Sequence, residues 1–201
     1  MKNNRIPLLP GVCYHIYNHA NGFENLFRNA GNYDFFLKKY IKYIPAIAET
    51  YVYCLMPNHI HIVVRIKSED ELPAYCKVNG KANSNKICQQ FGNVFSAYTQ
   101  AFNKQQSRMG GLFIPNFKRK PVENAAYFRN LIPYVHLNAV VANFVSHPAD
   151  WPHSSFASYF SDCPSRLDRE TVLNFFGGRE GFLLAHKLPV EDWFLKFMAE
   201  W

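Results

Sequence analysis

The sequence predicts an α+β protein whose antiparallel sheet follows the split βαβ pattern, with one further helix after the last strand. Three observations lead to this class. Residues 59–66 (HIHIVVRI) alternate as a strand does, a turn at 56–58 (MPN) precedes them, and apolar positions recur at helical spacing in 33–44 and 86–104. Both of these helices would cover one face of the sheet, so we expect the additional helix on the other face.

The first half of the chain supplies three of the four predicted strands. Residues 11–20 alternate and are rich in β-forming side chains, and Asn21-Gly22 marks a turn after them. The helix at 33–44 ends before a proline. A second strand at 50–55 forms a hairpin with 59–66 through the MPN turn.

The second half is expected to complete the sheet and to add the further helix. Residues 68–84 are polar and predict a loop, and 111–117 (GLFIPNF) predict a short strand after a pair of glycines. Lys118-Arg119-Lys120-Pro121 is interpreted as a basic turn. The pattern over 123–144 predicts a helix that is interrupted or kinked at Pro133, because proline donates no backbone hydrogen bond.

Size and composition predict one main domain over residues 1–148 and a C-terminal appendage over 149–201 that packs on it and is not independent. A chain of 201 residues that is 48% hydrophobic can bury such a core. Within the appendage, weak helical patterns occur at 168–176 and 191–201. We find no apolar run of about 18 residues, so no membrane span is expected.

Charge and cysteine usage bound the compartment and the partners. The formal net charge of +7 favours a polyanionic partner, nucleic acid first. The five cysteines form an odd set without a CxxC pair, which argues for reduced thiols and against a disulfide scaffold or a thiolate zinc site. Because the N-terminal stretch is too polar for a secretory signal, we expect a cytoplasmic protein.

The predicted histidine strand carries the first candidate site residues. His59, His61, Val63 and Arg65 share one side of the strand, because side chains alternate faces. Two imidazoles on one face can bind the same divalent cation and leave positions for oxygen ligands or a substrate phosphate. The alternative is that they are ordinary strand histidines without a ligand.

The predicted last helix carries the second part of the candidate site. Tyr134 and Asn138 are four residues apart, which puts a phenol and a carboxamide on one helix face. A phenol attacks phosphorus well when a metal polarises the phosphate, and an amide oxygen can be a third ligand. The alternative is a structural role, since the chain has 12 tyrosines and Tyr98 and Tyr127 also occupy helical positions.

Three segments in order carry a resemblance to a known family. PNHIHIVV resembles the HUH motif (His, hydrophobic, His) of single-strand DNA transposases that use one catalytic tyrosine. YVHLNAVVANFV and DWPHSSFASY are similar to the YIHLNPVRAGLV and WPWSSYRAY pattern of transposase-like proteins associated with repetitive extragenic palindromes (REP). GLFIPNFKRKPV is similar to their GHLFQGRFKSKPV segment. The resemblance covers residues 13–176.

The resemblance implies a fold, a reaction and a site. It implies a ferredoxin-like sheet with the tyrosine-bearing helix over the histidine face. His59, His61 and Asn138 would bind Mg²⁺ or Mn²⁺, and Tyr134 would be the nucleophile that forms a 5′-phosphotyrosine link and releases a 3′-hydroxyl. The expected function is a metal-dependent single-strand DNA endonuclease and strand transferase. Its substrate would be a DNA hairpin with a short flanking guide sequence.

The basic segment and the departures from the family pattern concern DNA contacts. Lys118, Arg119 and Lys120 would form a phosphate-contacting, DNA-binding patch, although a solvated turn is the plain alternative. The chain has Ala139 where the family has proline and Val141 where it has arginine. These departures affect expected DNA contacts and leave the histidines, Tyr134 and Asn138 in place.

Two rival functions and two oligomeric states stay open at this point. A non-catalytic regulator derived from a transposase would bind hairpin DNA or RNA without cleaving it. A metallonuclease that uses water would release free 5′-phosphate ends. The protein is expected to be a monomer or a homodimer.

Overall fold

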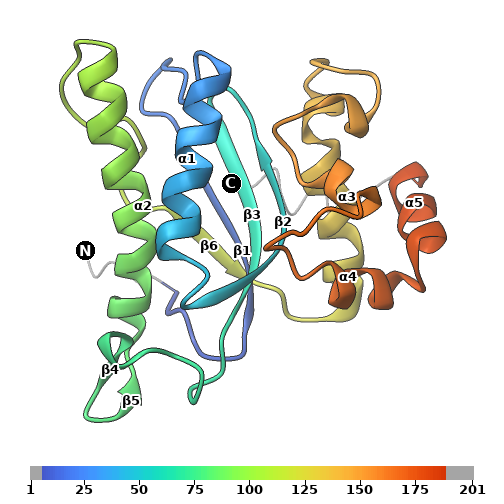
Figure 1. Cartoon of the computed structure of the whole chain (residues 1–201), viewed down its shortest axis with the longest axis horizontal. Helices are drawn as coiled ribbons and strands as arrows, with labels where there is room; N and C mark the ends of the chain where they lie inside the picture. The colour runs from blue at the N-terminus through green and yellow to red at the C-terminus, as the bar shows by residue number, and fades with distance from the viewer. Residues whose placement is uncertain (1–5, 189–201) are drawn as a thin grey trace.

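The computed structural model describes residues 6–188, and its centre is a four-stranded antiparallel sheet in the order β2-β3-β1-β6. The strands are β1 (Cys13–His19), β2 (Ala48–Leu55), β3 (His59–Ile66) and β6 (Lys118–Pro121). With the helices in sequence between them, this is the split βαβ arrangement (Figure 1). The predicted α+β class is confirmed.

Two long helices cover one face of the sheet (Figure 1). They are α1 (Ala30–Tyr43) and α2 (Ser84–Gln105), and each begins at an asparagine whose side chain caps the first turn, Asn29 and Asn83. Beneath them lies the first apolar core. The predicted inward row of β3 belongs to this core, and its members are at most 2% exposed: Ile60, Ile62, Val64 and Ile66.

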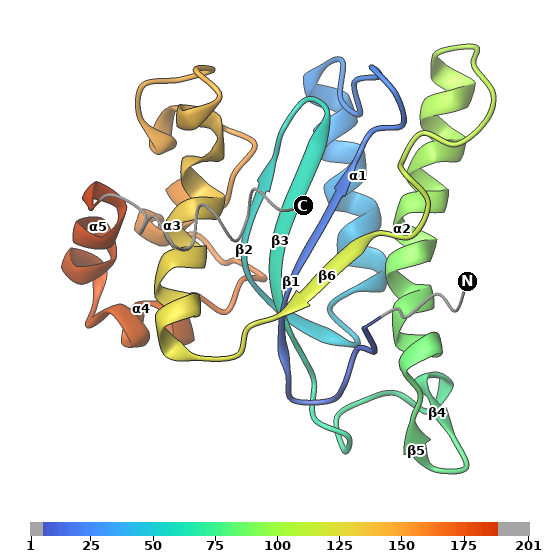
Figure 2. The same cartoon turned by 180° about the vertical axis from the view of Figure 1, so that it is seen from behind.

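The opposite face of the sheet, which is turned toward the viewer in Figure 2, packs on a second apolar core. Helix α3 (Ala125–Val141), with Pro133 inside it, packs on this face, as the sequence predicts for the additional helix, and it lies beside β2. The remaining helices pack outside α3 and against β2: the short η2 (Pro148–Asp150) and η3 (Phe156–Phe160), then α4 (Arg169–Phe176) and α5 (Arg179–Lys187). The described part of the C-terminal segment therefore shares a core with the sheet.

Strand β2 lies at one edge of the sheet, and the C-terminal segment contacts that edge. An antiparallel bridge joins Cys54 to Ser154, and a parallel bridge joins Thr50 to Leu167. The backbone N–H of Leu55 also donates to the carbonyl of His153, at 2.9 Å. These contacts satisfy backbone groups of β2 that an edge strand otherwise leaves to solvent.

The fourth strand differs from the prediction. The predicted strand at 111–117 is wrong, because within it only Phe113 makes an isolated bridge, to Ala20. Instead Lys118–Pro121, predicted as a basic turn, forms β6 and pairs antiparallel with β1. The apolar side chains that suggested a strand, Leu112 and Phe113, are buried in the first core. Tertiary pairing with β1 overrides the weak β-propensity of lysine here.

Smaller differences occur in the connections. The predicted loop at 68–84 contains η1 (Ala74–Cys76) and a short hairpin of β4 (Lys77–Val78) and β5 (Lys81–Ala82). Helix α4 confirms the helix predicted at 168–176, whereas α5 was not predicted. The predicted helix at 191–201 lies outside the described residues.

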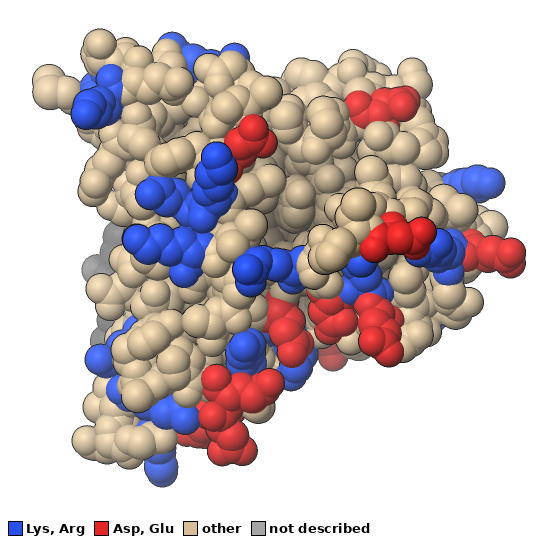
Figure 3. Space-filling view, viewed as in Figure 1, with Lys and Arg blue, Asp and Glu red and all other residues tan. Residues whose placement is uncertain are grey.

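Charged side chains are unevenly distributed over the face with α1 and α2. In Figure 3, lysine and arginine side chains are frequent in the centre and on the left, and acidic side chains gather below the centre and on the right. All five cysteines are free thiols. Among residues 6–188, no helix is both long and apolar enough to span a membrane.

Candidate active site

The pairing of β1 with β3 gathers four histidines on the face that α3 adjoins. His19 lies opposite His59, Tyr17 opposite His61 and His15 opposite Val63. The rings of His19 and His59 stack with centroids 4.7 Å apart, and those of His15 and His61 are 5.0 Å apart. The sequence motif revealed only the two histidines of β3, because the other two become neighbours through strand pairing.

Helix α3 brings Tyr134 and Asn138 to the same place. The ring of Tyr134 lies edge-on to His61, with centroids 5.6 Å apart, and to His15, at 6.4 Å. The Nδ2 of Asn138 donates to the backbone carbonyl of Tyr134 at 2.7 Å, which fixes the amide so that Oδ1 faces β3. The structure thus unites the predicted phenol, amide and imidazoles on one side of the sheet.

His59 is held in a form suited to binding a cation. Its Nδ1 lies 2.8 Å from Oδ1 of Asn58, so the proton of the neutral ring belongs on Nδ1. Its Nε2 then presents a lone pair to Oδ1 of Asn138, 3.5 Å away. That distance is too long for a good hydrogen bond, whereas two ligands of one Mg²⁺, each at about 2.1 Å, lie roughly 3 Å apart.

Burial keeps the imidazoles neutral. The pKa of His59 is lowered to about 4, chiefly by burial and then by neighbouring His19, while Asn138 opposes the shift. The pKa of His61, which is 5% exposed, is also lowered well below its usual value by burial and by His15. Neutral imidazole is the form that binds metal, so both rings are available near pH 7.

His15 orients His61 from the neighbouring strand. The Nε2 of His15 lies 2.9 Å from Nδ1 of His61, so these two nitrogens share one proton in a hydrogen bond. This contact occupies Nδ1 of His61 and leaves its Nε2 as the ring nitrogen that could bind a cation. Burial, followed by the charge of nearby Lys120, lowers the pKa of His15 to about 3. Such a partner to the second nitrogen is characteristic of metal-binding histidines.

The phenol of Tyr134 is protonated in the free protein. Burial raises its pKa above the usual value, and the Asn138 side chain offsets part of that shift. The adjacent Tyr17 has its pKa raised to about 12 by burial and then by Tyr134. A phenol in this environment becomes a strong nucleophile only when its proton leaves or when positive charge is placed near it.

The donor set fits an oxygen-preferring divalent cation that keeps open positions. Two imidazoles and one amide oxygen face a common space, and among residues 6–188 they are joined by no carboxylate, so a bound ion would complete its shell with water or phosphate oxygens. Within residues 6–188 there is no cluster of three or more His, Cys, Asp and Glu side chains suited to a metal. The site therefore differs from a closed structural metal site.

The predicted basic patch is divided between the two faces of the sheet. In β6, Lys118 and Lys120 pair with Tyr17 and His15 and share the histidine face, whereas Arg119 pairs with Ile16 and points to the α2 side. Lys120 is only 8% exposed and Lys118 is exposed. The three side chains do not form one surface, because consecutive strand residues alternate.

A buried hydrogen-bonded chain anchors the tyrosine-bearing helix, and its role was not predicted. The backbone N–H of Tyr53 in β2 donates to Oγ of Ser155, which lies 2.8 Å from Nε2 of His136. The Nδ1 of His136 lies 2.8 Å from Nε2 of His186, whose Nδ1 donates to the carbonyl of Phe182. Ser155 and His136 are fully buried, so this chain positions α3 rather than meeting a substrate.

A split βαβ sheet with paired imidazoles facing a tyrosine-bearing helix is the architecture that the sequence resemblance predicted, that of the single-tyrosine HUH transposases. Comparisons with known proteins give particular relatives, although no family model matches the chain. The chain is 28% identical to a "Putative REP-associated tyrosine transposase" of Haemophilus influenzae over an alignment of 112 residues. This alignment covers 54% of this chain and 58% of the relative. The chain thus matches little more than half the length of that relative.

A solved structure agrees in fold. The REP-associated tyrosine transposase bound to a REP hairpin superposes with a TM-score of 0.62 at 17% identity, over 84% of this chain and 94% of that one. At this identity the likeness shows the fold alone. The two relatives together confirm the predicted resemblance to REP-associated tyrosine transposases.

Proposed function

We propose that this chain is a metal-dependent single-strand DNA endonuclease and strand transferase of the REP-associated type, which acts at DNA hairpins. The observation that supports this most is the convergence of Tyr134, His59, His61 and Asn138 on one face of the sheet. These side chains come from a strand and a helix that are distant in sequence. Their chemistry suits attack by a phenol on a phosphodiester.

The ion would be Mg²⁺ or Mn²⁺, held by His59, His61 and Oδ1 of Asn138. When bound, it would supply positive charge that polarises the scissile phosphate. His15 and Asn58 would keep both imidazoles in the orientation that the structure shows, since each contacts the other ring nitrogen.

Tyr134 would carry the covalent step. Its Oη forms a bond to phosphorus as the bond from phosphorus to the 3′ oxygen breaks, and the proton lost by the phenol is balanced by the proton that the 3′-hydroxyl gains. The product is a 5′-phosphotyrosine link, and attack by another 3′-hydroxyl reverses the step and joins strands. One ester replaces another, so no external energy source is needed.

The proposed substrate is a DNA hairpin with a single-stranded flank. The net charge of +7 favours a polyanion, and the relative of known structure is bound to a REP hairpin. Lys118 lies on the histidine face, where it would contact a phosphate near the site.

Detection of the covalent link tests the proposal. The protein is incubated with a library of single-stranded DNA hairpins and Mn²⁺, and SDS-resistant DNA is isolated for mass spectrometry of the modified peptide. We expect the adduct on Tyr134, its loss in Tyr134→Phe with hairpin binding retained, and its persistence in the matched control Tyr127→Phe on the same helix. Adduct formation by Tyr134→Phe at the wild-type rate would refute this assignment.

One alternative function has an observation in its favour. Tyr134 packs partly buried against the second apolar core, which raises the pKa of its phenol and suits a protein that binds hairpin DNA or RNA and does not cleave it. In the same gel, binding without adduct would support that regulator. Free 5′-phosphate ends that survive Tyr134→Phe would instead support a metallonuclease that uses water.

A further inference from the structure

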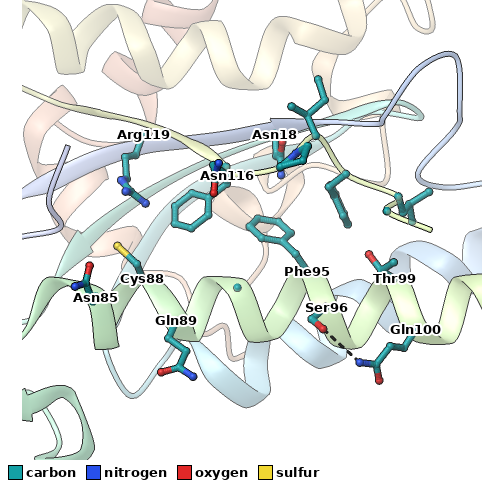
Figure 4. A pocket seen from close by; sticks show the side chains of 17 residues that line it. Asn18, Asn85, Cys88, Gln89, Phe95, Ser96, Thr99, Gln100, Asn116 and Arg119 are labelled. Atoms are coloured by element: carbon teal, nitrogen blue, oxygen red, sulfur yellow. Dashed lines mark hydrogen bonds between the residues drawn. The ribbon is translucent and has the colours of Figure 1, made fainter. Parts of the chain in front are cut away.

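A surface cavity of about 590 Å³ lies on the side of the sheet opposite the candidate active site. It opens between α2 and the segment 111–119 that leads into β6 (Figure 4). Asn18 of β1 and Arg119 of β6 line it from the sheet, and both alternate with neighbours that face the histidines. The edge strand β6 therefore separates this cavity from the catalytic face.

One wall of the cavity is aromatic. Phe95 of α2 contacts Phe113, with ring centroids 4.9 Å apart, and Phe117, at 5.6 Å. Phe95 and Phe117 are only partly buried, so ring surface remains accessible from the cavity. Partly exposed aromatic rings are the surfaces on which unpaired bases stack.

Among the described residues, the polar lining consists of amides, hydroxyls and the thiol of Cys88, with one cation and no carboxylate. Asn18 is 3% exposed, and its Oδ1 accepts from the backbone N–H of His19. Its Nδ2 makes no hydrogen bond to any residue in the part of the chain that the structure describes. Figure 4 shows Asn18 and Asn116 on one side of the cavity and Thr99 opposite, on α2. Arg119 lies over the ring of Phe117, with its guanidinium carbon 4.8 Å from the ring centroid.

We propose that this cavity binds an unpaired nucleobase of the DNA strand that is cleaved at the candidate active site. The inference rests on the proposed function and adds a separate recognition site to it. A nucleobase is a neutral heteroaromatic ring with donors and acceptors on its edge, which matches aromatic walls beside amide side chains. Sequence preference in the single-stranded flank would be determined here.

The edge strand explains how one DNA strand reaches both places. Lys118 lies on the histidine face, and the next residue, Arg119, lies on the cavity face. A DNA backbone that crosses β6 would meet the exposed Lys118 on one side and Arg119 on the other, so its phosphates are neutralised along the path. Because β6 is an outer strand of the sheet, the DNA backbone has to pass around one strand only.

Gly92 offers a test that spares the fold. It lines the cavity from the interior of α2, and a Cβ added there meets no atom within 4 Å. Gly92→Leu would fill the cavity, and a leucine is a better helix former than glycine at such a position. Gly92→Ala is the matched control, because it changes the helix and leaves most of the volume open.

Affinity is measured for a hairpin with a single-stranded flank, for the same hairpin without it, and for flanks with one abasic position each. We expect Gly92→Leu to weaken binding of the flanked hairpin about tenfold, as losing one stacked base would, and to leave the bare hairpin unchanged. In the wild type and in Gly92→Ala, one abasic position in the flank should lower the affinity by about the same tenfold factor. In Gly92→Leu, that abasic position should cause no further loss of affinity.

Equal affinity of Gly92→Leu and Gly92→Ala for every flanked hairpin would overturn the proposal. It would also be overturned if an abasic position lowered the affinity of Gly92→Leu as much as that of the wild type. Both results would leave the proposed function intact if the adduct on Tyr134 still forms. Flank binding with the expected pattern but without any adduct would support the cavity and refute the catalytic proposal. A wild-type protein that binds no single-stranded DNA would overturn both.

Discussion

The Nε2 of His59 lies 3.5 Å from Oδ1 of Asn138, although 79 residues separate them in the chain. Both atoms carry lone pairs when Nδ1 of His59 is protonated and Asn138 donates to the carbonyl of Tyr134. Two acceptors so close repel each other unless positive charge lies between them. This pair is therefore where a cation would stabilise the folded site most directly, and the predictions begin from it.

The contact between Asn58 and His59 should tune metal affinity. Asn58→Ala removes the acceptor for Nδ1, so the ring loses its fixed tautomer, and Mn²⁺ affinity should fall about 10-fold or more. Titration calorimetry or Mn²⁺ electron paramagnetic resonance gives the dissociation constant without DNA. Asn93→Ala on α2 is the control, and equal affinities in the two variants would contradict the role of Asn58.

Ser155, which belongs to the buried hydrogen-bonded chain, should contribute more to stability and to the rate of adduct formation than its neighbour Ser154. Ser155→Ala leaves buried Nε2 of His136 without its hydroxyl partner, which should lower the free energy of unfolding by about 1–3 kcal/mol. The rate of adduct formation should fall while hairpin affinity holds, because α3 is less firmly positioned. Ser154→Ala, with hydroxyl contacts of 3.3 Å, serves as the control.

If Ser154→Ala and Ser155→Ala lose stability and activity in the same proportion, the hydrogen bond between Ser155 and His136 has no special role in positioning α3. Denaturant unfolding and single-turnover cleavage, both measured well below the unfolding temperature of each variant, separate the two contributions.

Stability should fall as the pH is lowered from 7 to 4. The pKa of His186 is lowered to about 4, chiefly by burial, and that of His136 is also lowered. These two histidines take up protons near pH 6.5 in the unfolded chain and only at lower pH in the folded chain, so acid favours unfolding. Each such group contributes about 1.4 kcal/mol per pH unit within that window.

Denaturant unfolding across this range measures the slope. His186→Asn should give a shallower slope than the wild type because it removes one of these groups, and an unchanged slope would contradict the assignment.

Lys118 should contribute a phosphate contact that does not depend on sequence. Lys118→Gln should weaken binding to all hairpins alike and reduce the salt slope of the affinity by about 1. Lys42→Gln on α1, on the opposite side of the sheet, should change neither. Hairpin affinity measured between low and physiological salt tests this prediction. A loss of affinity in Lys118→Gln that depends on the hairpin sequence would indicate a contact with a base instead of a phosphate.

Local patterns in the sequence were sufficient for much of the fold and for the central part of the site. The strand at 59–66 and the helix with Tyr134 and Asn138 were predicted because alternation and helical periodicity are local signals. The order of elements also predicted that the two long helices cover one face of the sheet and that the tyrosine-bearing helix packs on the other face. The structure then brings the predicted residues together, while their roles stay predictions.

What was missed depends on contacts between distant segments. Lys118–Pro121 forms a strand because β1 pairs with it, and no local signal favours a strand in a run of lysines. His15 becomes the neighbour of His61 only through strand register, and Ser155 meets His136 only after the C-terminal segment packs on α3. Such relations require the tertiary structure.

The two outer strands of the sheet also limit how copies of this protein can associate. The segment that follows α3 bonds to the backbone of β2, and β6 is short, rich in lysine and ends in Pro121. Within residues 6–188, strand-by-strand extension, the usual route to aggregation of exposed β-sheets, therefore finds no long unprotected ribbon at either side of this sheet. We expect any dimer to form through side-chain surfaces, and crowding on DNA not to promote fibrils by itself.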